Sequence, residues 1–153
     1  GMSIRLMQGV PVGDTQVWCN RGVSGIDGST STAMGAAAAC PDRPLLLVTG
    51  DMSAAYDIGA LADPSTAGNF NMLVVDNGGG DIFRRIKPTS DLPEREQFLA
   101  AMPLFPLAAL ADAYGFAYVR ATAAECTEDM LTDILRNDKK TIIHLITDQY
   151  TAS

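Results

Sequence analysis

Apolar residues occur along the chain in short runs that polar side chains do not interrupt. The clearest runs lie at 44–50, which ends in glycine, and at 71–76, which ends in aspartate. Uninterrupted runs of this length are typical of strands that are covered on both faces of a sheet. Other short segments are also interpreted as strands. The full set of predicted strands is 16–19, 44–50, 71–76, 116–120 and 141–146.

Segments that favour helix alternate with these strands. Residues 29–40 are rich in alanine, the strongest helix former. Residues 126–136 are amphipathic, and Thr122 or Thr127 marks the helix start, with acidic residues in the first turn. Further helices are predicted at 52–61 and 107–114. The alternation predicts an α/β fold, a doubly wound and mostly parallel sheet with helices on both faces.

The length of 153 residues predicts a single domain, which we place at 2–153. Gly1 precedes Met2 and is interpreted as an expression scar. The segment 81–103 contains three prolines and is predicted to be irregular. An irregular segment of this length in a compact domain usually means function or mobility.

The composition excludes several classes of function. A net charge of −7 argues against a nucleic-acid surface, which needs clustered basic side chains. The apolar runs are too short to span a bilayer, and no signal segment opens the chain. We expect the cysteines to be reduced in a cytoplasmic fold. Three separated cysteines form neither a disulfide framework nor a C-x-x-C metal site.

Polar residues follow two of the predicted strands at the place where doubly wound sheets bind ligands, beyond the carboxyl ends of the strands. Asp51 and Asn77 follow the strands at 44–50 and 71–76, so both side chains can converge on one crevice. Carboxylate and amide oxygens suit Mg²⁺. The glycines after Asn77 allow a backbone carbonyl, that of Gly79, to turn toward the same ion.

An anionic ligand can complete such a site. Magnesium is rarely caged by protein alone, and phosphate oxygens often fill its remaining positions. The backbone N–H groups near Met52 and Ser53, at the start of a predicted helix, could bind that phosphate. The alternative is that Asp51 only caps this helix, which is a common role for aspartate.

The order Gly50-Asp51, then about 25 residues, then Asn77 resembles the thiamine-diphosphate signature, Gly-Asp-Gly ending in Asn-Asn. The chain departs from the signature twice, since Met52 replaces the third glycine and Asp76 replaces the first asparagine. The second asparagine is the metal ligand in that family, and Asn77 matches it.

Three longer stretches carry a more specific resemblance. They are Asn-Arg-Gly-Val-Ser-Gly-Ile-Asp-Gly at 20–28, Gly-Asp-Met-Ser-Ala-Ala-Tyr-Asp at 50–57 and Asp-Asn-Gly-Gly-Gly-Asp-Ile-Phe at 76–83. Together they resemble the 2-succinyl-5-enolpyruvyl-6-hydroxy-3-cyclohexene-1-carboxylate synthases, the MenD family. The resemblance covers roughly residues 2–88, and the remainder follows by fold pattern alone.

The resemblance implies a cofactor site. It makes Asp51, Asn77 and the Gly79 carbonyl the ligands of Mg²⁺, with Mn²⁺ as the alternative ion. Further cofactor contacts follow from the same match: Gly50, Met52 and Ser53 at the diphosphate, Ser24 and Gly25 along the pyrimidine, and Ile26 as the apolar wedge that bends the cofactor.

The resemblance also implies a substrate pocket. Arg21 would bind a substrate carboxylate, Ile82 and Phe83 would border the pocket, and Arg5 would be a second arginine there. The residue types themselves leave alternatives, because arginine is usually a surface residue. A core contact would explain Ile26 nearly as well as a wedge role, and Phe83 is more often a core aromatic.

What the family does is the last implication. Its members decarboxylate 2-oxoglutarate and add the succinyl unit to isochorismate in menaquinone biosynthesis, as homo-oligomers, dimers or tetramers. Their activating glutamate sits in an N-terminal pyrimidine-binding domain, and no stretch here resembles that domain or the central one. We therefore expect no catalytic residue in this chain, no activity from it alone, and no nucleic-acid or membrane partner.

Two other classes of function stay open. One is a different thiamine-diphosphate-dependent decarboxylase or a split subunit whose partner carries the glutamate. The other is a non-catalytic doubly wound binding module in which Asp51 is only a helix cap. Side chains outside the motifs are interpreted as ordinary: the single histidine, His144, as a strand residue, and the charged groups as solvated, namely Arg84, Arg85, Lys87, Glu94 and Glu96.

Overall fold

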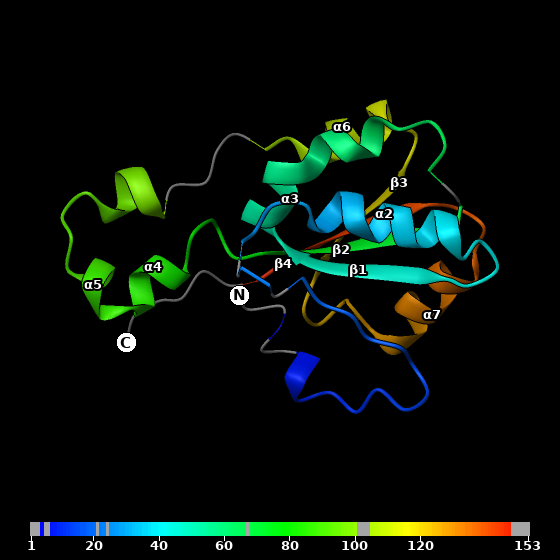
Figure 1. The fold of residues 1–153 in the computed structure, drawn as a ribbon, viewed down its shortest axis with the longest axis horizontal. Coiled ribbons are helices and arrows are strands. Elements are labelled where there is room, and N and C mark those ends of the chain that lie inside the picture. The colour runs from blue at the N-terminus through cyan, green and yellow to red at the C-terminus, as the bar shows by residue number, and fades with distance from the viewer. Residues whose placement is uncertain are drawn as a thin grey trace.

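The computed structural model describes residues 4, 7–20, 22–23, 25–66, 68–100 and 105–147. Within these residues, four parallel strands form one sheet in the order β1-β2-β4-β3 (Figure 1). The strands are β1 (Leu45–Gly50), β2 (Phe70–Asp76), β3 (Ala117–Thr122) and β4 (Thr141–Ile146). The parallel α/β sheet that the apolar runs predict is therefore confirmed.

Helices cover both faces of this sheet. Figure 1 shows α2 (Ser29–Ala39), α3 (Asp51–Asp57) and α6 (Leu107–Ala113) on one side and α7 (Glu128–Arg136) on the other. A 3-10 helix, η1 (Ile58–Ala62), extends α3, so the helix predicted at 52–61 is present but changes geometry at its end. Of the two predicted starts for α7, Thr127 is the N-cap, because its side chain accepts a hydrogen bond from the Met130 N–H.

The core lies between β2 and the helices above it. Phe70, Met72 and Val74 alternate along β2, are fully buried, and pack against buried alanines of α2, α3 and α6. The Phe116 ring meets the Phe70 ring edge-on, at 6.2 Å between centroids. This packing holds β2 in place and so fixes the sheet edge at which it ends.

The register of the strands decides which residues meet at that edge. Gly50, the last residue of β1, is the Cα partner of Val75 in β2. Asp76, the last residue of β2, is the partner of Ile146 in β4. Asp51 and Asn77 therefore emerge from neighbouring strands at the same edge, as the sequence predicts.

The strand predicted at 16–19 is wrong. These residues have no regular secondary structure, and Val17 and Trp18 are 49% and 73% exposed. Strand propensity reflects packing against neighbouring strands and depends strongly on context, so three apolar residues in a row, Val17 to Cys19, do not by themselves make a strand.

The irregular segment predicted at 81–103 contains helical turns instead. They are α4 (Ile82–Arg85), α5 (Lys87–Ser90) and the π-helix η2 (Arg95–Leu99). Pro88 lies in the first turn of α5, where its missing N–H removes no helical hydrogen bond. We name these residues, 82–99, the side lobe, because Figure 1 shows them at the left of the molecule, beside the sheet rather than over it.

The structure also bears on the membrane and disulfide predictions. In the described part of the chain, no helix is both long and apolar enough to cross a membrane. Cys19, Cys40 and Cys126 are free thiols.

Candidate functional site

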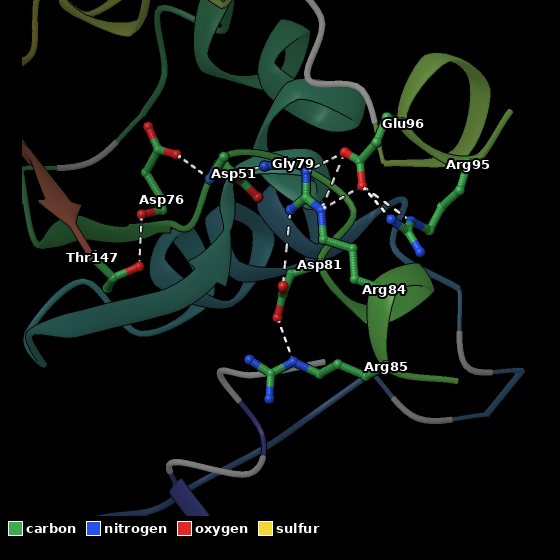
Figure 2. A network of polar contacts seen from close by, with 10 residues as sticks. Asp51, Asp76, Gly79, Asp81, Arg84, Arg85, Arg95, Glu96 and Thr147 are labelled. Carbon is green, nitrogen blue, oxygen red and sulfur yellow. Dashed lines mark hydrogen bonds and ion pairs between the residues drawn. The ribbon is translucent and has the colours of Figure 1, made fainter. Parts of the chain in front are cut away.

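Asp51 joins the ends of two strands. The residue follows β1 directly and is only 3% exposed. Its Oδ2 accepts a hydrogen bond of 2.7 Å from the Gly79 N–H, a contact drawn in Figure 2. Its Oδ1 accepts one of 2.7 Å from the Met52 N–H. Because Gly79 comes 28 residues later, this carboxylate ties the start of α3 to the turn after β2.

A helix-capping role explains only part of this arrangement. The N-cap of α3 is Gly50, and no side-chain hydrogen bond caps the helix. One Asp51 oxygen bonds the N–H of the adjacent residue, while the other reaches the turn after the neighbouring strand. The carboxylate therefore organises two loops as well as the beginning of one helix.

The turn that follows β2 contains a buried side-chain oxygen, that of Asn77. Asn77 Oδ1 is buried and has no hydrogen-bond partner among the described residues. Gly78 and Gly79 have φ angles of 78° and 110°, which side chains rarely tolerate, so the turn depends on glycine. The Gly79 carbonyl accepts a hydrogen bond of 2.9 Å from the Asp81 N–H. A carbonyl has two lone pairs, so this oxygen keeps the capacity for a further ligand.

Two carboxylates lie close together at this edge and shift each other's pKa. Burial raises the pKa of Asp51 above its usual value and the negative charge of Asp76 adds to the rise, against the N–H donors of Gly79 and Met52. Burial acts in the same direction on Asp76. There, hydrogen bonds from the Gly78 N–H and His144 outweigh it and hold the pKa of Asp76 below its usual value.

The loop at 20–28 contacts the start of α3. Ser53 Oγ donates a short hydrogen bond to the Ile26 carbonyl and lies 3.5 Å from Ser29 Oγ. Gly25 is exposed, and Ile26 is 44% exposed, so a core contact does not explain this isoleucine. The loop at 20–28 and the start of α3 thus meet at Ser53.

Three predicted site residues lie outside the described residues. They are Arg5, Arg21 and Ser24. The described neighbours of Arg21 and Ser24 belong to the exposed loop that reaches Ser53 through Ile26.

The predicted pocket residues Ile82 and Phe83 follow the glycine turn in α4. Ile82 is 47% exposed, whereas Phe83 is half-buried. A Cβ built on Gly80 would lie 2.8 Å from the Phe83 ring, so this ring lies directly against the turn. The structure brings both residues to the side-lobe end of the site.

Three of the five charged side chains predicted to be solvated form ion pairs, namely Arg84, Arg85 and Glu96. Arg84 binds Glu96 through both its Nε and a terminal nitrogen, the latter at 2.9 Å (Figure 2). Arg95 also binds Glu96, at 3.0 Å, and Arg85 binds Asp81 at 2.6 Å. Arg84 and Arg95 lower the pKa of Glu96 to about 2. The Arg84–Glu96 pair links α4 to η2.

His144 contacts Asp76, a role that its place in an apolar strand does not predict. Its Nε2 lies 2.7 Å from Asp76 Oδ2, and its Nδ1 lies 2.7 Å from the Tyr118 hydroxyl. Thr147, directly after β4, also bonds the backbone carbonyl of Asp76 (Figure 2). The sequence contains only a weak indication of this contact. The strands predicted at 71–76 and 141–146 end at the same edge of a parallel sheet, and the second contains the only histidine of the chain.

The donor set at this edge fits a divalent cation. It combines one buried carboxylate, one buried amide oxygen without a partner, and one backbone carbonyl, all of them hard oxygen ligands. No cluster of three or more His, Cys, Asp or Glu side chains that could hold a metal occurs among the described residues. A cation here would therefore need oxygens from a ligand or from water to complete its coordination.

Sequence comparison matches residues 3–145 to the family described as thiamine pyrophosphate enzyme, C-terminal TPP binding domain. The relatives include three 2-succinyl-5-enolpyruvyl-6-hydroxy-3-cyclohexene-1-carboxylate synthases. The protein of Porphyromonas gingivalis is 38% identical over 82% of this chain and 22% of its own length. Those of Desulfotalea psychrophila and Flavobacterium psychrophilum are 42% and 39% identical, over 69% and 84% of this chain and 20% and 23% of their own lengths.

A solved structure supports the same fold. The thiamine diphosphate-dependent 4-hydroxybenzoylformate decarboxylase of Rhodococcus jostii superposes with a TM-score of 0.61 at 27% identity. The match covers 81% of this chain and 23% of that chain. The chain thus spans about a fifth of the length of the curated relatives it matches.

Proposed function

Because the chain belongs to the family of C-terminal thiamine-pyrophosphate-binding domains of thiamine pyrophosphate enzymes, we propose that its Asp51–Asn77 edge binds Mg²⁺ and the diphosphate of thiamine diphosphate. The observation that carries the proposal is Asn77 Oδ1, which is buried beside the Asp51-bonded turn and has no hydrogen-bond partner within the part of the chain that the structure describes. Burying such an atom costs free energy unless a partner arrives, and a metal ion is that partner.

Each predicted residue has a role in this proposal. Asp51, Asn77 and the Gly79 carbonyl hold the metal, and Mn²⁺ can replace Mg²⁺. Gly50, Met52 and Ser53 line the diphosphate at the junction of β1 and α3. Around the organic part of the cofactor lie Ser24, Gly25 and Ile26, with the exposed side chain of Ile26 available as the wedge.

We propose further that the whole protein is a 2-succinyl-5-enolpyruvyl-6-hydroxy-3-cyclohexene-1-carboxylate synthase acting on 2-oxoglutarate and isochorismate. Support comes from the 38–42% identity to synthases of that name. The bound cofactor would supply the electron sink for decarboxylation. Arg21 and Arg5 would bind substrate carboxylates, for which bidentate guanidinium groups are suited. Ile82 and Phe83 would border the substrate.

The remaining parts of the working enzyme would lie outside this chain. We propose that a pyrimidine-binding domain carries the activating glutamate, that the full protein is a cytoplasmic dimer or tetramer, and that residues 2–153 alone are inactive. The share of about a fifth of the relatives' length supports a multidomain enzyme. Assays of the full-length protein beside this chain, with light scattering for oligomeric state, test these points.

Calorimetric titration of the full-length protein with thiamine diphosphate tests the cofactor proposal. Binding is expected with Mg²⁺ and not with excess chelator. Asp51→Ala should remove Mg²⁺-dependent binding, because it deletes the buried carboxylate. The matched control is Asp133→Ala, which deletes an exposed carboxylate of α7 on the other side of the sheet. Unchanged binding by Asp51→Ala would refute the ligand assignment.

A second candidate function is decarboxylation of a different 2-oxo acid. It is favoured by the structural match to a thiamine diphosphate-dependent 4-hydroxybenzoylformate decarboxylase. The ratio of kcat/KM for 2-oxoglutarate to kcat/KM for benzoylformate separates the two candidates. A ratio well above one, with product formation only when isochorismate is added, supports the synthase. A ratio below one supports the decarboxylase.

A further inference from the structure

A chain of hydrogen bonds crosses three strands beside the proposed metal site. It begins at the Tyr118 hydroxyl on β3, which lies 2.7 Å from Nδ1 of His144 on β4. It continues from His144 Nε2 to Asp76 Oδ2, at the end of β2, over 2.7 Å. These strands are neighbours in the sheet in the order β2-β4-β3. Tyr118 is level with Ile142 and His144 is level with Val74, so the chain of hydrogen bonds crosses the sheet obliquely and reaches the ligand-binding edge at Asp76.

The Asp76 carboxylate, at one end of the chain, determines which atom donates in each hydrogen bond. An ionised carboxylate accepts hydrogen bonds and cannot donate them. His144 Nε2 therefore carries the proton and donates it to Asp76. A neutral imidazole with a protonated Nε2 has an accepting Nδ1, so the Tyr118 hydroxyl donates to it. Tyr118 thus selects the tautomer that can hold Asp76.

Asp76 is anchored on its backbone as well. The Thr147 N–H and the Thr147 hydroxyl both donate to the Asp76 carbonyl, each at 2.9 Å. The Asp76 side chain in turn accepts a hydrogen bond of 2.9 Å from the Gly78 N–H through Oδ1. Asp76 is therefore held by β4 on one side and holds the glycine turn on the other, with Asn77 between the two attachments.

We propose that His144 is a positioning residue, which through Asp76 holds the Asn77–Gly79 turn in the conformation that binds the metal. The inference rests on the proposed function, because it concerns the affinity of that same site. A carboxylate that is oriented by an imidazole and itself orients a ligand-bearing turn is an outer-sphere partner of the metal. Changing such partners typically lowers metal affinity by about 10–100-fold.

The test compares His144→Leu with His144→Gln in the full-length protein. Leucine fills a similar volume without a donor, whereas glutamine places an amide N–H within reach of Asp76. We expect the Mg²⁺ dissociation constant, measured by titration in the presence of thiamine diphosphate, to rise about 10–100-fold in His144→Leu. In His144→Gln it should return to within a few-fold of the natural protein.

Tyr118→Phe provides a second variant that keeps the fold, with Tyr114→Phe as its matched control. Tyr114 is a half-buried tyrosine just after α6 and outside the chain of hydrogen bonds. Without the Tyr118 hydroxyl, the proton of His144 is no longer held on Nε2, so Mg²⁺ affinity should fall. Tyr114→Phe should leave the Mg²⁺ affinity unchanged. If His144→Leu does not fold, Tyr118→Phe and His144→Gln decide the question.

Nitrogen NMR of the metal-free protein gives a readout that does not depend on binding. The imidazole resonances that disappear in His144→Gln should show Nε2 protonated and Nδ1 as an acceptor. A proton on Nδ1 would overturn the inference.

The outcomes separate this inference from the proposed function. If the natural protein shows no Mg²⁺-dependent binding, the proposed function fails. If it binds and His144→Leu binds equally well, only the positioning role fails. A His144→Leu variant that loses thermal stability without a change in Mg²⁺ affinity also refutes the positioning role, because it describes a purely structural histidine.

Discussion

At the scale of single residues, two polar groups at the Asp51–Asn77 edge are buried in ways that are unfavourable without a metal ion. Asn77 Oδ1 is buried without a partner among the described residues. The buried Asp51 carboxylate lies near a second carboxylate, and its pKa is raised by burial and by that neighbour. Both features lower the stability of the metal-free protein, because burying an unpaired polar group or an unpaired charge costs free energy. A cation would turn each of them into a favourable contact.

Asn77→Ala should have little effect on the stability of the metal-free protein and a large effect on cofactor binding. In metal-free protein the substitution should not lower the free energy of unfolding by the amount usual for a lost hydrogen bond, because Oδ1 accepts none from the described residues. Mg²⁺-dependent binding of thiamine diphosphate should be lost. Chemical denaturation without metal and calorimetry with metal measure the two effects. A variant that is strongly destabilised but still binds would contradict the prediction.

At the scale of elements, the side lobe is attached to the sheet through Gly80. The Gly80 N–H donates to the Ala100 carbonyl at 3.1 Å, which brings the end of η2 against the turn. A Cβ on Gly80 would lie 2.5 Å from the Leu99 carbonyl oxygen and 3.2 Å from Ala100 Cα. The close approach of two backbones, rather than a special φ angle, requires glycine here.

Gly80→Ala should therefore destabilise the protein by about 1–3 kcal/mol, the usual cost of overpacking. Gly35→Ala is the matched control, since Gly35 lies within α2 and a Cβ there meets no atom within 4 Å. That change should stabilise the protein by about 0.5–1 kcal/mol through helix propensity. Equilibrium urea denaturation measures both. Equal changes in the free energy of unfolding for the two substitutions would show that the backbone at Leu99 and Ala100 does not restrict the side chain at position 80.

The ion pairs within the lobe predict a pH dependence. Arg84 and Arg95 lower the pKa of Glu96 to about 2, from 4.5 in an unperturbed glutamate. For a lowered pKa, the stabilising effect is complete above the unfolded value and is lost as the pH falls through the folded one. The difference in unfolding free energy between the natural protein and Glu96→Gln should thus shrink below about pH 4.5.

Denaturation at a series of pH values from 7 downward, at low salt, measures this difference. Because the pairs are exposed, the effect should be small, and high salt should reduce it further. A difference that grows on acidification would contradict the assigned ion pairs.

At the scale of the whole molecule, the cofactor should act as a stabilising ligand. A ligand at about 100 times its dissociation constant adds about 2.7 kcal/mol to the free energy of unfolding when it binds only the folded state. Thiamine diphosphate with Mg²⁺ should raise the melting temperature of the full-length protein, and a chelator should reverse the rise. Asp133→Ala should respond in the same way and Asp51→Ala should not. A chelator-insensitive rise would show that binding does not use the metal.

The sequence by itself determined the sheet and most of its helices. Strands β1 and β2 follow from apolar runs, and β4 follows from an apolar segment that contains His144. Burial on both faces leaves a local pattern that can be read without knowledge of the neighbouring strands. The loops at the ligand-binding edge follow as well, since parallel strands end at one edge. The motif at Asp51 and Asn77 placed the candidate site on two of these loops.

Only the tertiary structure decided which side chains meet. Residues 16–19 failed as a strand because pairing depends on a neighbour, which the local pattern does not contain. The contact between His144 and Asp76 joins residues 68 positions apart. The strand register sets His144 beside Val74, two residues before Asp76, and the side chains then meet diagonally across β2 and β4. Arg84 and Glu96 meet only because α4 and η2 fold against each other. Hydrophobic periodicity is local and survives in the sequence, whereas polar pairing depends on geometry that the packed chain creates.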